Sequence, residues 1–526
     1  MQKLFQKAKL FLSRQPLFLL LLPLFFIYSG YNELFGFLSF KFILSNLFVI
    51  LICIAICLFV FYKLFHSITK ASVFSFILSL FCLVFGYVHD SLKQFIPQSF
   101  FVKFTFLIPA IFLLFLIVFI ILKKRKKNFV ELYLFLNLLF IVLLLSEIPN
   151  SVKRYQLDKS VDNLIDFRFN AYNEYKPVKT LPDSSKPDIY FLVFDAMASS
   201  KSILQNFGRN NYQLDTFLQQ QGFYVIPNGR ANYNWTIHSL STTFNMEYLP
   251  PWIAPVMNDG KAYFWGSASI LNNSLFRILK QEGYTINSYQ PISFDNKDWP
   301  GNSYFSNFKK YHYSFKTFPG RIYRDVFWNY SKIDVGFIRE RQFNIISNRN
   351  NEKKAYLDTT MALIKQSCSA SGKQKFIYGH FMIPHDPYTF DSTGKVKSPE
   401  QTIIKRKEDD AGAYYDQLLF AGNVIKDLVT YIQANNKKNT IIIVAGDHGY
   451  RSSESEKAGY NFENFNAFYF PDNDYTKLYD SISPVNTFRV VLNKSFGSNL
   501  PLLKDSSILV TVQKETIRKK EKINSK

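Results

Sequence analysis

Five apolar runs of near membrane-spanning length occupy the first 147 residues, and they constrain the fold more than any other feature. They cover about 16–34, 42–65, 71–89, 100–122 and 129–146. Each is close to the ~20 apolar residues that cross a hydrocarbon core as a helix. The first run is not read as a signal peptide, because four more follow it and no small-residue cleavage site is evident. The sequence therefore predicts an α-helical membrane domain of five transmembrane helices.

Basic residues predict how these helices are oriented. They gather before the first run and between the fourth and fifth runs, at Lys3, Lys7, Lys9, Arg14 and residues 123–127. Lysine and arginine concentrate on the cytoplasmic side of membrane proteins. Both clusters are therefore expected in the cytoplasm, and five crossings place residue 150 onward on the opposite face of the membrane.

Composition changes after the last apolar run and indicates four regions. The membrane domain covers 1–147, and a polar, proline-containing linker covers 148–187, with an amphipathic helix near 161–175 that would lie on the membrane surface. Residues 188–513 have the composition of a soluble domain, and 514–526 form a basic tail. The net charge of +22 suits anionic headgroups or phosphorylated glycans, or reflects a lysine-rich proteome, and no nucleic-acid partner is expected across the bilayer.

The soluble region alternates between helix-like and strand-like segments. A continuous apolar run at 188–194 is typical of a buried central strand. Further strands are expected at 222–226, 284–289, 375–383, 439–446 and 487–492, and helices at about 200–220, 236–248, 273–282, 355–368 and 410–434. This pattern predicts an α/β sheet covered by helices on both faces, with ligands bound at the carboxyl ends of the strands.

Residues capable of chemistry fall at these expected strand ends. Asp195 follows the first strand, and Asp447 and His448 follow the strand at 439–446, where two acids and an imidazole suit a divalent ion. His380 and His385 lie in and after the strand at 375–383. Structural alternatives remain open, because Asp195 also fits a helix cap and His385 a turn. Cysteine-based metal clusters are excluded from the soluble region, which has a single cysteine, Cys368.

Thr236 is the candidate nucleophile. It stands where the polar segment 232–235 gives way to apolar helical spacing, so it is expected at or near a helix N-terminus, where unpaired N–H groups favour an anion. A divalent ion lowers the pKa of a coordinated hydroxyl and neutralises charge on a transferred phosphoryl group. The alternative is that Thr236 only caps the helix.

Four motifs together resemble the alkaline phosphatase/sulfatase superfamily, and more narrowly its membrane-anchored branch, which includes phosphoethanolamine transferases and lipoteichoic acid synthases. They are Asp-Ile-Tyr-Phe-Leu-Val-Phe-Asp195, Asn-Tyr-Asn-Trp-Thr236-Ile-His-Ser239-Leu, Pro-His385-Asp-Pro-Tyr and Gly-Asp447-His448-Gly. The resemblance covers roughly 186–495 and implies an alkaline-phosphatase/sulfatase-like α/β domain. It implies a metal site of Asp195, Thr236, Asp447 and His448, with Thr236 as nucleophile.

The same resemblance assigns substrate or leaving-group contacts to His385, with His380 as a lesser candidate. Arg451 is a candidate for pairing with a substrate phosphate, although the sequence favours a plain surface arginine. Two departures stand out. The phosphoethanolamine and lipoteichoic acid enzymes carry glutamate where this chain has Asp195, and the sulfatase motif of Cys or Ser followed by x-Pro-x-Arg is replaced by Thr236-Ile-His-Ser.

The expected function is a metal-dependent transferase, using Zn or Mn. It would move a phospho-substituent such as phosphoethanolamine or glycerophosphate from a phospholipid donor, through a covalent phospho-threonine, to a cell-envelope glycan or lipid acceptor. Two alternatives stay open: a phosphate- or sulfate-ester hydrolase on the same scaffold, and a non-catalytic domain that binds an envelope polymer. The expected location is the bacterial inner (cytoplasmic) membrane, multi-pass, with a periplasmic catalytic domain.

Overall fold

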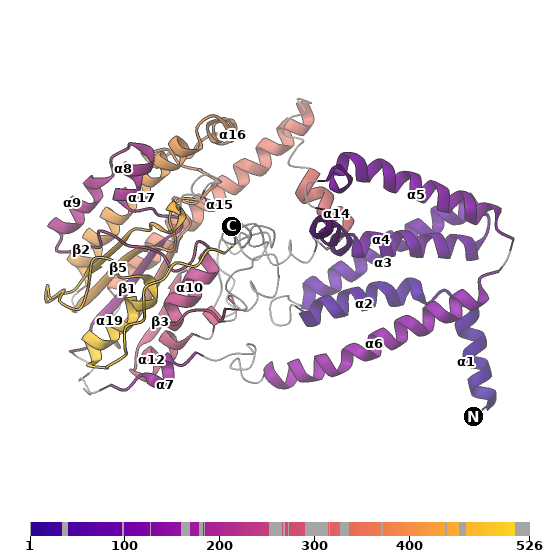
Figure 1. Ribbon diagram of the computed structural model, residues 1–526, viewed down its shortest axis with the longest axis horizontal. Helices are drawn as coiled ribbons and strands as arrows, with labels where there is room; N and C mark the ends of the chain where they lie inside the picture. Colours follow the sequence, from indigo (N-terminus) through magenta and orange to yellow (C-terminus); the bar gives the residue numbers. More distant parts are fainter. Residues whose placement is uncertain are drawn as a thin grey trace, which may run out of the picture. The chain divides into compact units, whose positions relative to one another are not determined.

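The computed structural model describes residues 2–33, 40–96, 99–126, 128–158, 169–177, 182, 185–251, 266, 269–271, 273–289, 314, 316–326, 336–369, 372–436, 439–451 and 459–510. The chain divides into two compact units (Figure 1). Unit 1 comprises Met1–Leu164 and Ser306–Val335, and unit 2 comprises Ile165–Phe305 and Gly336–Lys526. The predicted tail at 514–526 lies outside the described residues, as do residues 161–168 of the predicted linker helix, of which the described part is helical only at Ala171–Glu174.

Unit 1 is built from apolar helices. They are α1 (Gln2–Arg14), α2 (Phe18–Glu33), α3 (Phe40–Phe65), α4 (Ile68–Phe95), α5 (Phe104–Lys124) and α6 (Val130–Asp158), with a 3-10 turn η1 (Phe100–Val102) before α5. Within the described residues, α3 to α6 are each long and apolar enough to cross a membrane, and α1 and α2 together form a fifth candidate span bent by 87°. Counting the bent pair as one span gives the five predicted from the sequence.

The bend between α1 and α2 is held by one polar side chain of α6. The Asn137 side chain accepts a hydrogen bond from the Phe18 N–H at 2.6 Å and donates to the carbonyls of Leu12 and Gln15 at 2.6 and 2.7 Å. Backbone groups released by a helix break are costly in a membrane unless they are paired. Asn137 pairs three of them, so the break is a built feature of this unit.

A short segment from the second half of the sequence packs on the C-terminal end of α4. It contains α14 (Phe318–Arg321) and the π-helical turn η4 (Ile322–Val326). Phe318 stacks edge-on against Phe85 at 4.9 Å, the Lys316 carbonyl accepts a hydrogen bond from the α4 backbone, and Arg321 pairs with Asp90. This segment lies inside the region predicted as one soluble domain, yet it groups with unit 1.

Unit 2 is organised around a six-stranded mixed sheet with the order β2-β6-β5-β1-β4-β3. The strands are β1 (Asp188–Phe194), β2 (Tyr224–Val225), β3 (Thr285–Tyr289), β4 (Lys375–Phe381), β5 (Thr440–Gly446) and β6 (Asn466–Tyr469). Strands β5, β1, β4 and β3 run parallel, whereas β6 and β2 pair in antiparallel fashion. The carboxyl ends of β1, β4 and β5 therefore meet at one edge of the sheet, as the sequence predicts.

Helices cover both faces of this sheet (Figure 1), and alternate side chains of β1 face the two layers. Phe191 and Val193 pack with α10 (Thr236–Asn245), α12 (Ser274–Gln281) and α19 (Pro484–Phe496). Leu192 and Phe194 pack with α8 (Ser200–Phe207), α9 (Tyr212–Gln220), α15 (Gly336–Cys368) and α17 (Asp410–Asn435). Shorter elements are α7 (Ala171–Glu174), α16 (Pro399–Glu408) and η6 (Tyr460–Phe462). The predicted α/β fold is confirmed.

Three local predictions need correction. The strand expected at 487–492 is part of the helix α19. The segment Thr-Phe-Arg-Val-Val-Leu reads as a strand because it is rich in β-branched and aromatic residues. The helix is buried nearly all round here, even at Arg489, so no exposed polar face reveals its 3.6-residue period. The helix expected at 200–220 is two helices, since Gly208 adopts a left-handed conformation (φ 61°) that ends the first. The helix expected at 355–368 begins at Gly336.

Candidate active site

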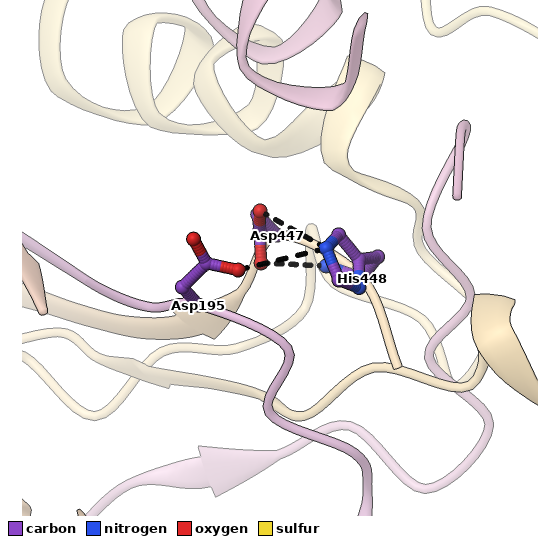
Figure 2. Close-up of side chains that lie close together, drawn as sticks. All are labelled: Asp195, Asp447 and His448. Carbon is purple, nitrogen blue, oxygen red and sulfur yellow. Dashed lines mark hydrogen bonds and ion pairs between the residues drawn. The ribbon is translucent and has the colours of Figure 1, made fainter. Parts of the chain in front are cut away.

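Three predicted ligands, Asp195, Asp447 and His448, converge at the carboxyl edge of the sheet (Figure 2). Asp195 directly follows β1, and Asp447 and His448 directly follow β5, which is the parallel neighbour of β1. All three are buried, and one ligand atom of each lies within 4.8 Å of the others. Gly446 permits this approach, because a Cβ atom there would lie 2.2 Å from the Met197 carbonyl oxygen.

Asp447 is fixed through one of its two carboxylate oxygens. Its Oδ1 atom accepts hydrogen bonds from the backbone N–H of Ala196 at 2.9 Å and of His448 at 3.0 Å. Its Oδ2 atom is buried and has no hydrogen-bond partner in the part of the chain that the structure describes. A buried, unpaired carboxylate oxygen is costly. Oδ2 is thus available as a ligand atom for a cation.

The Nε2 atom of His448 presents a lone pair toward the carboxylates of Asp195 and Asp447. Its Nδ1 atom donates to the Gly449 carbonyl at 2.7 Å, which leaves Nε2 without a proton. Nε2 lies 3.6 Å from Asp195 Oδ1 and 3.6 Å from Asp447 Oδ2. Burial lowers the pKa of His448 from 6.5 to about 4, so the imidazole is neutral near pH 7. Neutral imidazole is the form that binds metal ions.

The carboxyl of Asp195 is held in its ionised form. Burial raises its pKa, but the neighbouring His385 and His380 outweigh this effect, so the pKa lies well below its usual range. Its Oδ1 atom has no hydrogen-bond partner among the described residues. The helix-cap alternative for Asp195 is not what the structure shows, since this oxygen faces His448.

Thr236 is the first residue of α10, as the sequence predicts. Trp235 is the residue that caps this helix, and its side chain makes no capping hydrogen bond. The Thr236 Oγ1 atom lies 3.5 Å from His448 Nε2, on the side of the three ligands. The capping alternative for Thr236 is therefore excluded. Ser239, one turn further along, donates its hydroxyl to the Asp447 carbonyl and so supports the ligand loop.

These four residues fit a divalent ion. A tetrahedral ion with ligand bonds of about 2.0–2.2 Å separates its ligand atoms by about 3.3–3.6 Å. The three separations from His448 Nε2, to Thr236 Oγ1, Asp195 Oδ1 and Asp447 Oδ2, are 3.5, 3.6 and 3.6 Å. Hard oxygens with one imidazole suit zinc or manganese.

His385 and Arg451 form a second group beside the metal ligands. Arg451 Nη2 lies 2.7 Å from His385 Nε2, and the guanidinium stacks over the Trp235 ring at 4.4 Å. Arg451 Nη1 is buried and unpaired within the described chain. The His385 Nδ1 atom donates to the Asp386 carbonyl. Arg451 is thus oriented by His385 and Trp235, while its Nη1 atom still lacks a hydrogen-bond partner in the described chain. An ordinary surface arginine is not held in this way.

His380 is placed differently from His385. Its side chain is 1% exposed, and its Nε2 atom lies 3.5 Å from Asp195 Oδ2. Its Nδ1 atom lies 2.8 Å from the Tyr378 hydroxyl. The structure therefore brings His380 to Asp195, and not to the pair formed by His385 and Arg451.

Two buried residues that support the His385 loop were not anticipated from the sequence. Lys353, on α15, donates to the carbonyls of His385 and Pro387 at 2.7 and 2.9 Å. Gln417, on α17, donates to the carbonyls of Pro384 and His385 at 3.0 and 2.9 Å. Burial lowers the pKa of Lys353 from 10.5 to about 7. Both stand in ordinary helical patterns, so no local signal marks them.

The sequence model of the Sulfatase family matches residues 187–488. No curated protein matches the chain. Similar solved structures include the zinc-bound periplasmic domain of EptC from Escherichia coli, with 12% identity, TM-score 0.39, and coverage of 65% of this chain and 93% of that one. The periplasmic domain of the Campylobacter jejuni phosphoethanolamine transferase EptC has 11% identity, TM-score 0.35 and coverage of 61% and 92%.

The integral membrane lipooligosaccharide phosphoethanolamine transferase A of Neisseria meningitidis has 13% identity, TM-score 0.35 and coverage of 92% of this chain and 95% of that one. The family match covers more than half of the chain and spans every residue of the site described above. The chain belongs to the sulfatase family and is a sulfatase-like enzyme, a transferase or a hydrolase, with apolar N-terminal helices long enough to cross a membrane.

Proposed function

We propose that this enzyme is a metal-dependent transferase that moves a phospho-substituent from a phospholipid to a cell-envelope glycan or lipid through a covalent phospho-threonine at Thr236. The observation that carries the proposal is the position of the Thr236 hydroxyl. It begins a helix, where N–H groups lack intrahelical acceptors, and lies 3.5 Å from the lone pair of His448. A hydroxyl in this position is a nucleophile that can bind an ion through the same oxygen.

Asp195, Thr236, Asp447 and His448 would hold the ion. A bound Zn²⁺ or Mn²⁺ supplies Lewis acidity, which lowers the pKa of the threonine hydroxyl and neutralises charge on the phosphoryl group. Two aspartates balance the charge of one divalent ion, so the ionised Thr236 oxygen gives the site one net negative charge. The N-terminus of α10 faces this charge, and its dipole stabilises an anion there.

The reaction proceeds as two displacements at phosphorus. The Thr236 oxygen forms a bond to the phosphorus atom of the donor phosphodiester, and the bond from phosphorus to the lipid oxygen breaks. The proton of the Thr236 hydroxyl passes to the leaving lipid oxygen, with His385 Nε2 as the proposed carrier, which requires Arg451 Nη2 to leave this atom for the phosphoryl group. A hydroxyl of the acceptor then attacks the same phosphorus, the bond from phosphorus to the Thr236 oxygen breaks, and the acceptor proton passes through His385 Nε2 to the released Thr236 oxygen. Arg451 would donate to the non-bridging phosphoryl oxygens, for which its unpaired Nη1 is available.

The proposed location is the extracytoplasmic side of a bacterial inner membrane. Basic residues at the start of α1 and at 123–127, after α5, are expected in the cytoplasm. Membrane anchoring keeps the site near a phospholipid donor.

Labelled phospholipid tests the proposal. Full-length protein, loaded with Zn²⁺ or Mn²⁺, is incubated with lipid labelled in the headgroup phosphate and with envelope glycan or lipid extracts. We expect label on Thr236 and then on an acceptor, and loss of both in Thr236→Ala. Thr236→Ser, which keeps the hydroxyl, is the matched control and is expected to retain partial transfer. Transfer by Thr236→Ala would refute the mechanism, and release of free phosphate or sulfate without transfer would assign the enzyme as a hydrolase.

A further inference from the structure

Asp195 and Asp447 are held in the site by different means. Asp447 is fixed by two backbone N–H groups. No backbone N–H donates to the side chain of Asp195 in the described chain, and both of its oxygens face imidazoles instead. Oδ1 lies 3.6 Å from His448 Nε2 and Oδ2 lies 3.5 Å from His380 Nε2. The orientation of this carboxylate therefore depends on where the His380 ring lies and on whether its Nε2 atom carries the proton.

His380 is in turn oriented by Tyr378, two residues earlier on the same strand. The Tyr378 hydroxyl lies 2.8 Å from His380 Nδ1. Burial, and then the neighbouring Tyr356, Asp447 and Asp195, raise the pKa of Tyr378 well above its usual value. This hydroxyl has no other hydrogen-bond acceptor in the described chain, so we assign it as the donor to Nδ1, which puts the imidazole proton on Nε2. Nε2 lies 3.5 Å from the Oδ2 atom of Asp195, close enough for an electrostatic contact that stabilises the carboxylate, although the two atoms form no hydrogen bond in the described chain.

We propose that Tyr378 and His380 are positioning residues that hold Asp195 through Oδ2, so that Oδ1 remains free to bind the catalytic ion. This inference rests on the metal site of the proposed function. It gives His380 a role distinct from substrate contact, consistent with a side chain that is 1% exposed and enclosed by Tyr378 and Asp195.

Metal affinity, and not turnover, reports on this role. Zn²⁺ binding to the full-length protein is measured by competition with a chromophoric chelator, and Co²⁺ spectra report the ligand geometry. Loss of a partner that orients a metal ligand reduces affinity about 10–100-fold. We expect Tyr378→Phe to weaken Zn²⁺ binding about 10-fold, and His380→Leu to weaken it about 10–100-fold with an altered Co²⁺ spectrum. His380→Gln, which keeps a side-chain N–H donor, is expected to restore part of the affinity.

Tyr356→Phe is the matched control. The Tyr356 hydroxyl donates to the backbone carbonyl of His380 and not to its imidazole, so this variant is expected to bind Zn²⁺ like the wild type. The number of bound ions is expected to be the same in every variant. Wild-type affinity in His380→Leu would overturn the inference, as would the loss of one whole ion per chain, which would make His380 a ligand. A wild-type protein without tight metal binding would instead refute the proposed function itself.

Discussion

Replacement of Asp447 separates the stability of the fold from the metal site. One oxygen of this carboxylate accepts the N–H groups of Ala196 and His448, and the other has no partner in the described chain. Asparagine keeps one carbonyl oxygen for the two N–H donors but puts an amide NH₂ where the free oxygen stands. Asp447→Asn is therefore expected to keep the fold and lose the ion, whereas Asp447→Ala loses both.

The expected sizes of the two effects differ clearly. Alanine leaves two buried N–H groups without acceptors, and each costs about 1–3 kcal/mol, so metal-free Asp447→Ala is expected to be about 2–6 kcal/mol less stable. Asparagine weakens both bonds but removes a negative charge close to Asp195, and we expect metal-free Asp447→Asn to lie within about 2 kcal/mol of the wild type. Loss of a direct ligand is expected to lower Zn²⁺ affinity more than about 100-fold in both variants.

Denaturant unfolding of the chelator-treated protein, followed by tryptophan fluorescence, measures the first effect, and chelator competition measures the second. Asp188→Asn is the matched control. This buried carboxylate lies at the other end of β1 and accepts the Lys375 N–H at 3.0 Å, so its loss is expected to change stability without changing Zn²⁺ affinity. Equal destabilisation by Asp447→Asn and Asp447→Ala, or wild-type Zn²⁺ affinity in Asp447→Asn, would refute the reasoning.

Three further variants test other parts of the molecule. Arg451→Ala is expected to lower kcat/KM about 10–100-fold with unchanged metal content, because a charged donor to the phosphoryl group is lost; metal analysis and steady-state kinetics check this. Asn137→Leu removes three hydrogen bonds at the α1–α2 bend, so we expect the free energy of unfolding in detergent to fall by about 2 kcal/mol. Asn46→Leu is the control, because the Asn46 amide bonds only within its own helix, and its free energy of unfolding is expected to change little. Burial lowers the pKa of His238 from 6.5 to about 4, so between these two values the unfolded chain binds more protons than the folded one. The contribution of His238 to the free energy of unfolding is therefore expected to fall by about 2 kcal/mol as the pH drops from about 7.5 to 5. Unfolding titrations of His238→Phe are expected to show a correspondingly weaker pH dependence.

The sequence predicts much of this architecture because each feature depends on local order along the chain. The apolar runs at 42–65, 71–89, 100–122 and 129–146 correspond to α3, α4, α5 and α6, since length and hydropathy alone decide whether a helix can cross a membrane. The convergence of the proposed metal ligands could be predicted because parallel strands bring their carboxyl ends to one edge of a sheet. Asp195 and Asp447 each follow such a strand directly.

Contacts between distant segments could not be predicted in this way. Lys353 and Gln417 reach the His385 loop from two different helices, and only the packing of those helices on the sheet brings them there. The segment of α14 carries no apolar run of spanning length, and it belongs to unit 1 because it packs on α4 through Phe318, Lys316 and Arg321. The prediction of a strand at 487–492 is wrong because α19 is buried on nearly all sides there, and a helix without an exposed polar face shows no 3.6-residue period in its sequence.

The metal site itself is tested most directly by anomalous diffraction from crystals soaked with Zn²⁺ or Mn²⁺. We expect a peak bound by Asp195 Oδ1, Asp447 Oδ2, His448 Nε2 and Thr236 Oγ1, with each ligand atom at about 2.0–2.2 Å. A peak that leaves the Thr236 hydroxyl more than about 3 Å away, or tight binding elsewhere with these four atoms unoccupied, would contradict the assignment of Thr236 as a metal-bound nucleophile.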